Sequence, residues 1–252
     1  MELRLENLVI GFEKKQLNEL FSANFKAGNV YAILGQNGIG KSTLLKTIAG
    51  ILEPIGGSCI WDGTNLKQLT PEQRAKEVAI VLTGRPFVAD LTVEELIGLG
   101  RNPHKSWFYK ESATDRALCH EAATICNCLP FLNKKAVELS DGQFQLVMLA
   151  RAVAQDTPIL LLDEPTTHLD PAKKSELLFI LHKLAYEKGK LVLFSTHDVE
   201  FMFEAVKEVL VCTSDGFKLE HIDAIKDTAA INRIFPSKFL TYSEKLQQLK
   251  YR

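Results

Sequence analysis

The sequence predicts an α/β fold with a parallel sheet. Short, continuously apolar segments recur at residues 29–34, 77–82, 159–162 and 190–194. Segments of this length without polar alternation are typical of strands that are buried on both faces, as in a parallel sheet. Helical patterns lie between them, and no strand pattern interrupts residues 84–155. We therefore expect strands and helices to alternate around one helical insertion.

Several of the expected helices are marked at their first turn. Each has a hydroxyl or carboxylate residue that caps the turn, followed by a proline or by a residue that completes the cap: Thr70 with Pro71 and Gln73, Thr92 with Glu95, and Asp170 with Pro171. Inside the insertion, helical periodicity covers about residues 93–99, 115–128 and 142–154. The sheet is then expected to combine residues from both sides of this insertion.

Composition and charge limit the classes of protein to which the chain belongs. Its 252 residues, 46% hydrophobic and with a formal net charge of -1, are typical of a globular protein with one or two domains. The charge balance gives no basic surface for nucleic acid, so no nucleic-acid partner is expected. No apolar segment reaches the roughly 18 to 20 residues of a membrane span, and the first ten residues lack a signal-peptide pattern. We expect a cytoplasmic chain.

Residues 35–42 match the phosphate-binding loop that follows a strand and opens a helix. Glycines let the backbone wrap a phosphate, and the helix N-terminus supplies positive potential. Lys41 is expected to reach the β- and γ-phosphates, and Ser42 to offer a hydroxyl to Mg²⁺. A plain glycine turn does not explain Lys41 and Ser42 in this context. The expected ATP-binding residues here are Gly35, Gln36, Asn37, Gly38, Ile39, Gly40, Lys41, Ser42 and Thr43.

Two carboxylates follow the apolar segment 159–162. Asp163 is placed to hold Mg²⁺ through water, as in other nucleotide hydrolases. Glu164 is placed to orient or deprotonate the water that attacks the γ-phosphate. Taken alone, this pattern fits a strand that ends in a solvated acidic turn equally well.

The order of the remaining motifs resembles the ATP-binding subunits of ATP-binding-cassette (ABC) transporters. Residues 139–143 are similar to the signature of that family, residues 165–170 to its D-loop, and His197 to its switch histidine. The resemblance implies a P-loop NTPase (RecA-like) core with an N-terminal antiparallel β subdomain and an inserted α-helical subdomain. The implied divisions are an ABC ATPase domain over 1–220, with its core at about 1–83 and 156–220 and its helical signature subdomain at about 84–155, and a short C-terminal extension over 221–252.

The resemblance also implies a site shared between two subunits. In the family, a homodimer closes head to tail over two ATP molecules, and each signature faces the nucleotide held by the other chain. By this resemblance Asp170 couples the two sites, His197 contacts the γ-phosphate, and Phe12 stacks on adenine. The signature residues expected at the partner's nucleotide are Ser140, Asp141, Gly142 and Gln143. Taken alone, His197 is better explained as a surface or packing residue and Phe12 as a core residue, and only the order of the other motifs favours their functional roles.

Two residues depart from the family pattern. Thr83 occupies the usual position of the Q-loop glutamine, and its shorter side chain is expected to reach Mg²⁺ or the attacking water only through backbone movement or a bridging water. Asp141 stands where glycine is usual. It should stabilise the first turn of its helix by about 0.3–1 kcal/mol and repel a γ-phosphate. We expect its side chain to fold onto its own helix, so that Asp141→Gly lowers the ATP concentration needed for dimer closure.

Residues 91–104 narrow the resemblance to importers of iron chelates (siderophores), haem and cobalamin. A capped amphipathic helix closed by glycine and proline explains the same spacing without any substrate preference. Three aromatic residues follow, and they are candidate permease contacts or a local packing cluster: Trp107, Phe108 and Tyr109.

The combined motifs indicate a Mg²⁺-dependent ATPase that energises an importer. By resemblance, two copies work beneath an integral-membrane permease dimer at the inner face of the cell membrane and are served indirectly by a substrate-binding protein. Thr83 and Asp141 leave two alternatives open. One is a soluble ABC ATPase without a permease, such as an iron–sulfur assembly factor or a regulatory switch. The other is a nucleotide-binding scaffold that does not hydrolyse ATP.

Overall fold

A six-stranded sheet forms the centre of the computed structural model, which describes residues 1–12, 15–85, 90–104, 112–167, 169–236, 240–243 and 248–251. Five strands are parallel and the edge strand β12 is antiparallel. In spatial order the strands are β12 (Gly216–His221), β11 (Glu208–Thr213), β5 (Val30–Gly35), β10 (Leu191–Thr196), β9 (Ile159–Leu162) and β8 (Val78–Val81). The predicted α/β fold with a parallel sheet is confirmed.

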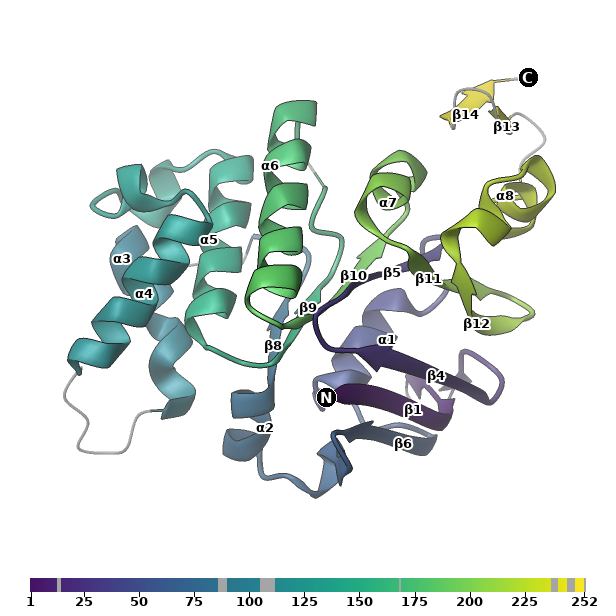
Figure 1. Ribbon diagram of the computed structural model, residues 1–252, viewed down its shortest axis with the longest axis horizontal. Coiled ribbons are helices and arrows are strands. Elements are labelled where there is room, and N and C mark those ends of the chain that lie inside the picture. Colours follow the sequence, from purple (N-terminus) through teal and green to yellow (C-terminus); the bar gives the residue numbers. More distant parts are fainter. Residues whose placement is uncertain are drawn as a thin grey trace.

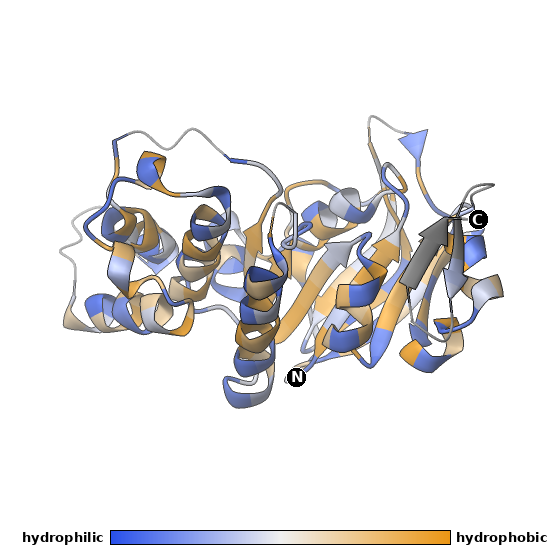
Figure 2. Cartoon of the chain, turned by 90° about the horizontal axis from the view of Figure 1, so that it is seen from above, coloured by the Kyte–Doolittle hydropathy of each residue, from blue (hydrophilic) through white to orange (hydrophobic). Residues whose placement is uncertain are grey.

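The continuous apolar character of these strands serves two separate cores. Successive side chains of a strand point to opposite faces of the sheet. On β5, Ala32 and Leu34 pack in the core beneath the helices, whereas Tyr31 and Ile33 pack in the second core. Apolar residues follow the strands of the central sheet in Figure 2. Burial on both faces therefore explains why no polar residue alternates along them.

The second core lies between the central sheet and a four-stranded antiparallel sheet (Figure 1). That sheet has the order β4 (Phe21–Lys26), β1 (Glu2–Val9), β6 (Gly56–Trp61) and β7 (Thr64–Asn65). Helix α1 (Lys41–Ile48) contributes Leu44, Leu45 and Ile48 to the same core. A short hairpin, β2 (Gly11–Phe12) with β3 (Lys15–Gln16), leaves the antiparallel sheet. The antiparallel subdomain implied by the family resemblance is present.

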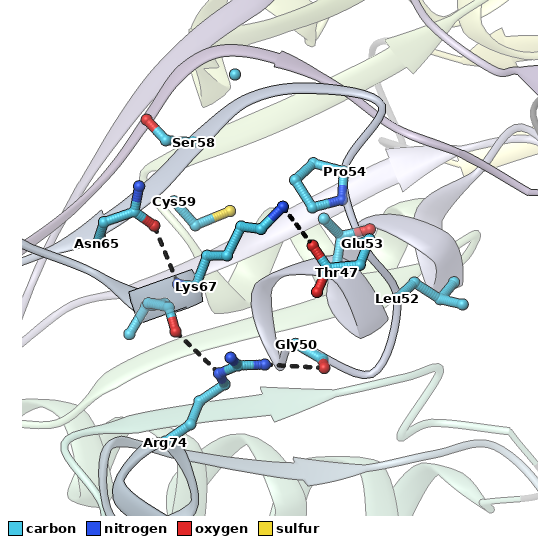
Figure 3. A pocket seen from close by; sticks show the side chains of 12 residues that line it. Thr47, Gly50, Leu52, Glu53, Pro54, Ser58, Cys59, Asn65, Lys67 and Arg74 are labelled. Carbon is cyan, nitrogen blue, oxygen red and sulfur yellow. Dashed lines mark hydrogen bonds and ion pairs between the residues drawn. The ribbon is translucent and has the colours of Figure 1, made fainter. Parts of the chain in front are cut away.

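Arg74, on α2 (Pro71–Glu77), ties this region together by donating to three main-chain carbonyls. Its guanidinium contacts Gly50 O at 2.9 Å (Figure 3). It also contacts Leu69 O at 3.1 Å and Leu66 O at 2.9 Å, the latter in η1 (Leu66–Gln68). The neighbouring cavity has a volume of about 30 Å³, which is room for about two water molecules. This cavity is too small for a nucleotide, and the contacts of Arg74 are structural.

A helical segment separates β8 from β9 and packs beside α6 (Figure 1). It contains α3 (Val93–Gly98), η2 (Leu99–His104), α4 (Ala113–Ile125), η3 (Leu129–Phe131), η4 (Ala136–Glu138) and α5 (Asp141–Ala154). The predicted helix starts at Thr70, Thr92 and Asp170 are confirmed, because each of these side chains accepts a main-chain N–H at N3. Trp107, Phe108 and Tyr109 lie outside the described residues.

Residues 100–104 bind the C-terminal end of α5. The Arg101 guanidinium donates to Ala154 O and forms a buried ion pair with Asp115, each at 2.8 Å. His104 Nε2 lies 2.8 Å from Gln155 O. Cationic groups at the last carbonyls of a helix stabilise its C-terminus. Packing against α5 therefore explains the spacing of residues 100–104 in structural terms.

Two further helices cover the face of the central sheet opposite α1, namely α6 (Pro171–His182), which continues into η5 (Lys183–Glu187), and α7 (Val199–Ala205) (Figure 1). The chain then forms η6 (Ile222–Ile225), α8 (Thr228–Ile234), β13 (Leu240–Ser243) and β14 (Gln248–Tyr251). Within the part of the chain that the structure describes, no helix has both the length and the apolar character of a membrane span.

Candidate active site

The phosphate-binding loop connects β5 to α1. Gly38 and Gly40 have φ angles of +82° and +112°, a left-handed region that glycine enters without steric cost. Gly40 is the N-cap of α1 and has no side chain to bond the first-turn amides. Those N–H groups, together with the helix dipole, form an anion-binding terminus. The local backbone thus has the geometry that the motif predicted.

Lys41 is buried, and its ammonium group is turned back into the loop. Its Nζ donates to Gly35 O at 2.8 Å and Gln36 O at 3.1 Å, and it lies 3.5 Å from Glu164 Oε1. A buried ammonium group requires anionic or carbonyl partners. A bound phosphate would supply more charge at this position than the two carbonyl oxygens do, so the surroundings of Lys41 fit a nucleotide polyphosphate.

Asp163 accepts two hydroxyl groups at one carboxylate oxygen. Ser42 Oγ lies 2.8 Å and Ser195 Oγ 2.7 Å from Asp163 Oδ1. The Asp163 carboxylate is nearly buried, at the end of β9. Hydroxyl and carboxylate oxygens are the ligand types that Mg²⁺ prefers. The Ser42–Asp163 pair therefore fits the predicted metal site.

Glu164 lies between the side chains of Lys41 and His197. Its Oε1 lies 3.5 Å from Lys41 Nζ, and its Oε2 lies 3.1 Å from His197 Nδ1. Its main-chain N–H donates to Ser195 Oγ at 2.8 Å. The backbone at Glu164 has a φ of +48°, a strained value for a residue with a side chain, and such values cluster at functional sites. The structure brings together the two residues for which a catalytic role was predicted.

Thr83 lies beside the same carboxylates, just after β8. Its hydroxyl donates to Asp163 O at 2.9 Å. The hydroxyl thus holds the loop after β8 to the end of β9, and a role of Thr83 at the metal stays a prediction.

Most of these residues line one open cavity of about 470 Å³, but Ser195 and His197 do not. It is lined by Asn37, Gly38, Gly40, Lys41, Ser42, Thr43, Lys46, Thr83, Asp163 and Glu164. Residues 139–143, all of which the structure describes, do not line it. Within one chain the signature therefore lies outside the phosphate-loop cavity.

The signature forms the start of α5. The Ser140 hydroxyl accepts the N–H of Gln143 at 3.3 Å, and the Gln143 side chain accepts the N–H of Ser140 at 3.1 Å, which is a capping box. The expectation that Asp141 folds onto its own helix is wrong. The capping position is taken by Ser140, and Asp141 Oδ1 instead accepts Arg85 Nη1 at 3.1 Å.

Phe12, Gly142 and Asp170 do not line the phosphate-loop cavity. Phe12 is 57% exposed on β2, which excludes the alternative of a core residue and leaves its ring open to stacking. Gly142 lies at the start of α5, beside Leu169. Asp170 caps α6 by accepting the N–H of Lys173 at 2.8 Å. Their roles towards nucleotide stay predictions.

Sequence analysis did not identify three residues of this region. Ser195 is a fully buried serine next to the carboxylates, and its polarity within the apolar strand β10 was a usable signal. Lys46 lines the cavity from the same helix as Lys41. Arg85 contacts the signature across 56 positions of sequence, a distance over which no local pattern is informative.

Comparison with known protein families decides the membership of this chain. A family model described as "ABC transporter" matches residues 19–167, which is more than half of the sequence. The chain belongs to the ABC transporter family. A model described as an AAA domain also matches, over residues 135–202. As an ABC cassette, the protein binds ATP and is an ATPase.

Individual ABC proteins match over most of the chain. An uncharacterised ABC transporter ATP-binding protein of Methanocaldococcus jannaschii is 35% identical and covers 96% of this chain and 84% of its own length. The iron(3+)-hydroxamate import ATP-binding protein FhuC of Bacillus subtilis is 35% identical, with 78% and 73% covered. The ferric enterobactin transport ATP-binding protein FepC of Escherichia coli is 33% identical over the same shares.

Solved structures of ABC proteins share the fold. A metal-chelate type ABC transporter in an inward-facing conformation superimposes with a TM-score of 0.80 at 28% identity, covering 93% of this chain and 88% of that one. A dimeric ABC transporter cassette superimposes with a TM-score of 0.76 at 26% identity, covering 87% and 98%. The combination of a parallel core, an antiparallel subdomain and a helical segment is therefore the ABC cassette fold.

Proposed function

We propose that this ABC ATPase is the Mg²⁺-dependent energising subunit of an importer for an iron–siderophore, haem or cobalamin-type solute. It works as a homodimer bound to a permease dimer at the inner face of the cell membrane. A substrate-binding protein delivers the solute to the permease. The solute itself does not contact this chain.

One observation carries the hydrolytic part of the proposal, namely the position of Glu164. Its carboxylate lies between Lys41 and His197 and directly follows Asp163, which bonds Ser42. A carboxylate beside the phosphate-binding lysine can orient or deprotonate the attacking water. Mg²⁺ held by Ser42 and Asp163 would neutralise charge that develops on the phosphates.

The dimer is supported by the location of the signature. Ser140 and Gln143 lie outside the cavity that contains Lys41, so in a single chain they do not face the nucleotide held there. A second copy in head-to-tail arrangement would bring its signature to this cavity, and a solved relative is described as a dimeric cassette. ATP would then act as the link that shifts the pair from open to closed.

The importer is supported by the relatives and by the helical segment. Two relatives are described as import or transport ATP-binding proteins for ferric siderophores. Residues 91–104 carry the pattern that resembles importers of this class. Among the proposed solutes, the names of these relatives support a siderophore chelate.

Glu164→Gln tests the proposed role directly. Loss of the general base should slow phosphate release at least about 100-fold while leaving ATP binding intact, so that an ATP-bound dimer accumulates in size-exclusion chromatography. Glu72→Gln, at the exposed first turn of α2, is the matched control and should hydrolyse ATP at the native rate. Native turnover by Glu164→Gln would overturn the assignment.

The importer itself is tested by co-purification from membranes. A tagged chain that retains a multi-helix permease, and whose ATPase rate changes on reconstitution with it, supports the importer. An active ATPase that remains without any membrane protein would favour the soluble alternative.

A further inference from the structure

Arg85 joins the loop after β8 to the start of the signature helix. Thr83 begins this connection by donating to Asp163 O, and Gly84 makes a turn with a φ of +107°. Arg85 then reaches the helical segment, where Nη2 donates to Ala136 O at 2.9 Å and Leu139 O at 3.1 Å. Three consecutive residues therefore link the end of β9 to the signature.

The Arg85 guanidinium is held in place independently of Asp141. It lies 4.7 Å from the centroid of the Phe144 ring, which is a favourable cation–π distance. Together with the two carbonyl contacts, this fixes the planar fork of the side chain before any carboxylate is added. An exposed ion pair usually contributes little because two long side chains must be ordered. Here the arginine is already ordered, so its pairing with Asp141 at 3.1 Å carries a smaller entropy cost.

Asp141 brings a negative charge to a helix start that, in the proposed dimer, faces the partner's ATP. Without a counter-charge this carboxylate would repel a γ-phosphate. The pairing with Arg85 gives it one and directs the carboxylate towards Arg85. The Ser140 hydroxyl and the first amides of α5 do not take part in this pairing.

We propose that Arg85 is a positioning residue that masks the charge of Asp141 and holds the signature ready for the partner's nucleotide. This rests on the proposed function, since it concerns the same dimer. It also revises the expectation for Asp141 alone, because the carboxylate does not act without its counter-charge. Arg85 itself is not placed at the reacting atoms.

The test uses the 252-residue chain in a Glu164→Gln background and measures the ATP concentration at half-maximal dimerisation by light scattering. Adding Arg85→Ala should raise this concentration by about three- to tenfold, the range expected for unmasking one charge at each of two sites. Adding Asp141→Asn to Arg85→Ala should bring it back to within about twofold of the parent. Arg85→Lys keeps the charge but loses the planar fork, so its ATP requirement should lie between that of the parent and that of Arg85→Ala.

Ionic strength separates a charge effect from a folding defect. Repulsion by an unmasked carboxylate is screened by salt, so the defect of Arg85→Ala should shrink as NaCl rises from 0.05 to about 0.5 M. A merely structural role predicts a defect that neither salt nor Asp141→Asn relieves, and this outcome would overturn the proposal. An unchanged ATP requirement in Arg85→Ala would also overturn it. If the parent itself fails to dimerise with ATP, the proposed function has failed instead.

Discussion

The Ser195 hydroxyl donates to the Asp163 carboxylate, with 2.7 Å between Ser195 Oγ and Asp163 Oδ1. Ser195 Oγ also accepts the main-chain N–H of Glu164 at 2.8 Å. One buried side chain thus fixes both consecutive carboxylates, the proposed metal ligand and the proposed base. The positive φ of Glu164 needs such support from its surroundings.

Ser195→Ala should reduce ATP turnover by more than the loss of one buried hydroxyl elsewhere in the fold does. Removing the hydroxyl leaves the Glu164 N–H without its buried partner, a penalty of about 1–3 kcal/mol, and loosens both carboxylates. We expect kcat to fall about tenfold and the Mg²⁺ concentration for half-maximal activity to rise, as measured by phosphate release. Thr157→Val, which removes an equally buried hydroxyl that bonds Ile159 O, is the control. Equal losses in both variants would argue against a special role of Ser195.

His197→Ala should lower turnover while ATP affinity changes little. His197 Nδ1 lies 3.1 Å from Glu164 Oε2, so its removal frees the carboxylate from its position beside Lys41. We expect kcat to fall about 100-fold, the lower end of the range for misplacing a general base, with nucleotide binding followed by a fluorescent ATP analogue. His120→Ala, on the exposed face of α4, should behave as native. A loss confined to ATP binding would contradict this role.

Gly98, the last residue of α3, and Gly100, in η2, give opposite predictions for the same substitution. A Cβ at Gly100 would lie 2.2 Å from Arg151 O, so Gly100→Ala forces η2 away from α5. This substitution should lower the free energy of unfolding by about 1–3 kcal/mol. A Cβ at Gly98 meets no atom within 4 Å, so Gly98→Ala should raise the free energy of unfolding by about 0.5–1 kcal/mol. Urea unfolding measures both. Equal effects would show that the close approach of η2 to α5 does not limit stability.

The sequence was sufficient for features that depend on neighbouring residues. The apolar segments predicted β5, β8, β9 and β10, and the caps at Thr92 and Asp170 marked α3 and α6. Periodicity and capping are local properties, so they are visible without tertiary structure. The order of the site motifs added the family, and their positions after strands placed Lys41 and Glu164 together.

Contacts between distant residues were not available from sequence. Arg85 meets Asp141 because a turn at Gly84 directs the loop after β8 across to α5. Without that path, the best expectation for a carboxylate at a helix start was a local cap. Ser140 fills that position instead. The packing of Gly100 on Arg151 O likewise depends on how η2 crosses α5.

Asp198 links the segment after His197 to α6 and makes stability depend on acid pH. Burial raises the pKa of this carboxyl. Hydrogen bonds from Lys174 Nζ and from the N–H of Phe201 lower the pKa by more than burial raises it, so the net pKa lies below its ordinary value. A lowered carboxyl pKa contributes stability above the pKa of the unfolded chain, about 3.9, and this contribution disappears as the pH falls through the folded value.

Asp198→Asn should therefore reduce the free energy of unfolding at pH 7, and the difference from the native chain should shrink as the pH falls below about 4. Urea unfolding at pH 7, 5, 4 and 3 measures it. Asp62→Asn is the control, because Asp62 lies in an exposed turn whose positive φ suits either residue. Its free energy of unfolding should follow that of the native chain at every pH. A difference that stays constant from pH 7 to pH 3 would contradict this role, because a contribution from the ionised carboxylate must disappear once the carboxylate is protonated in both states.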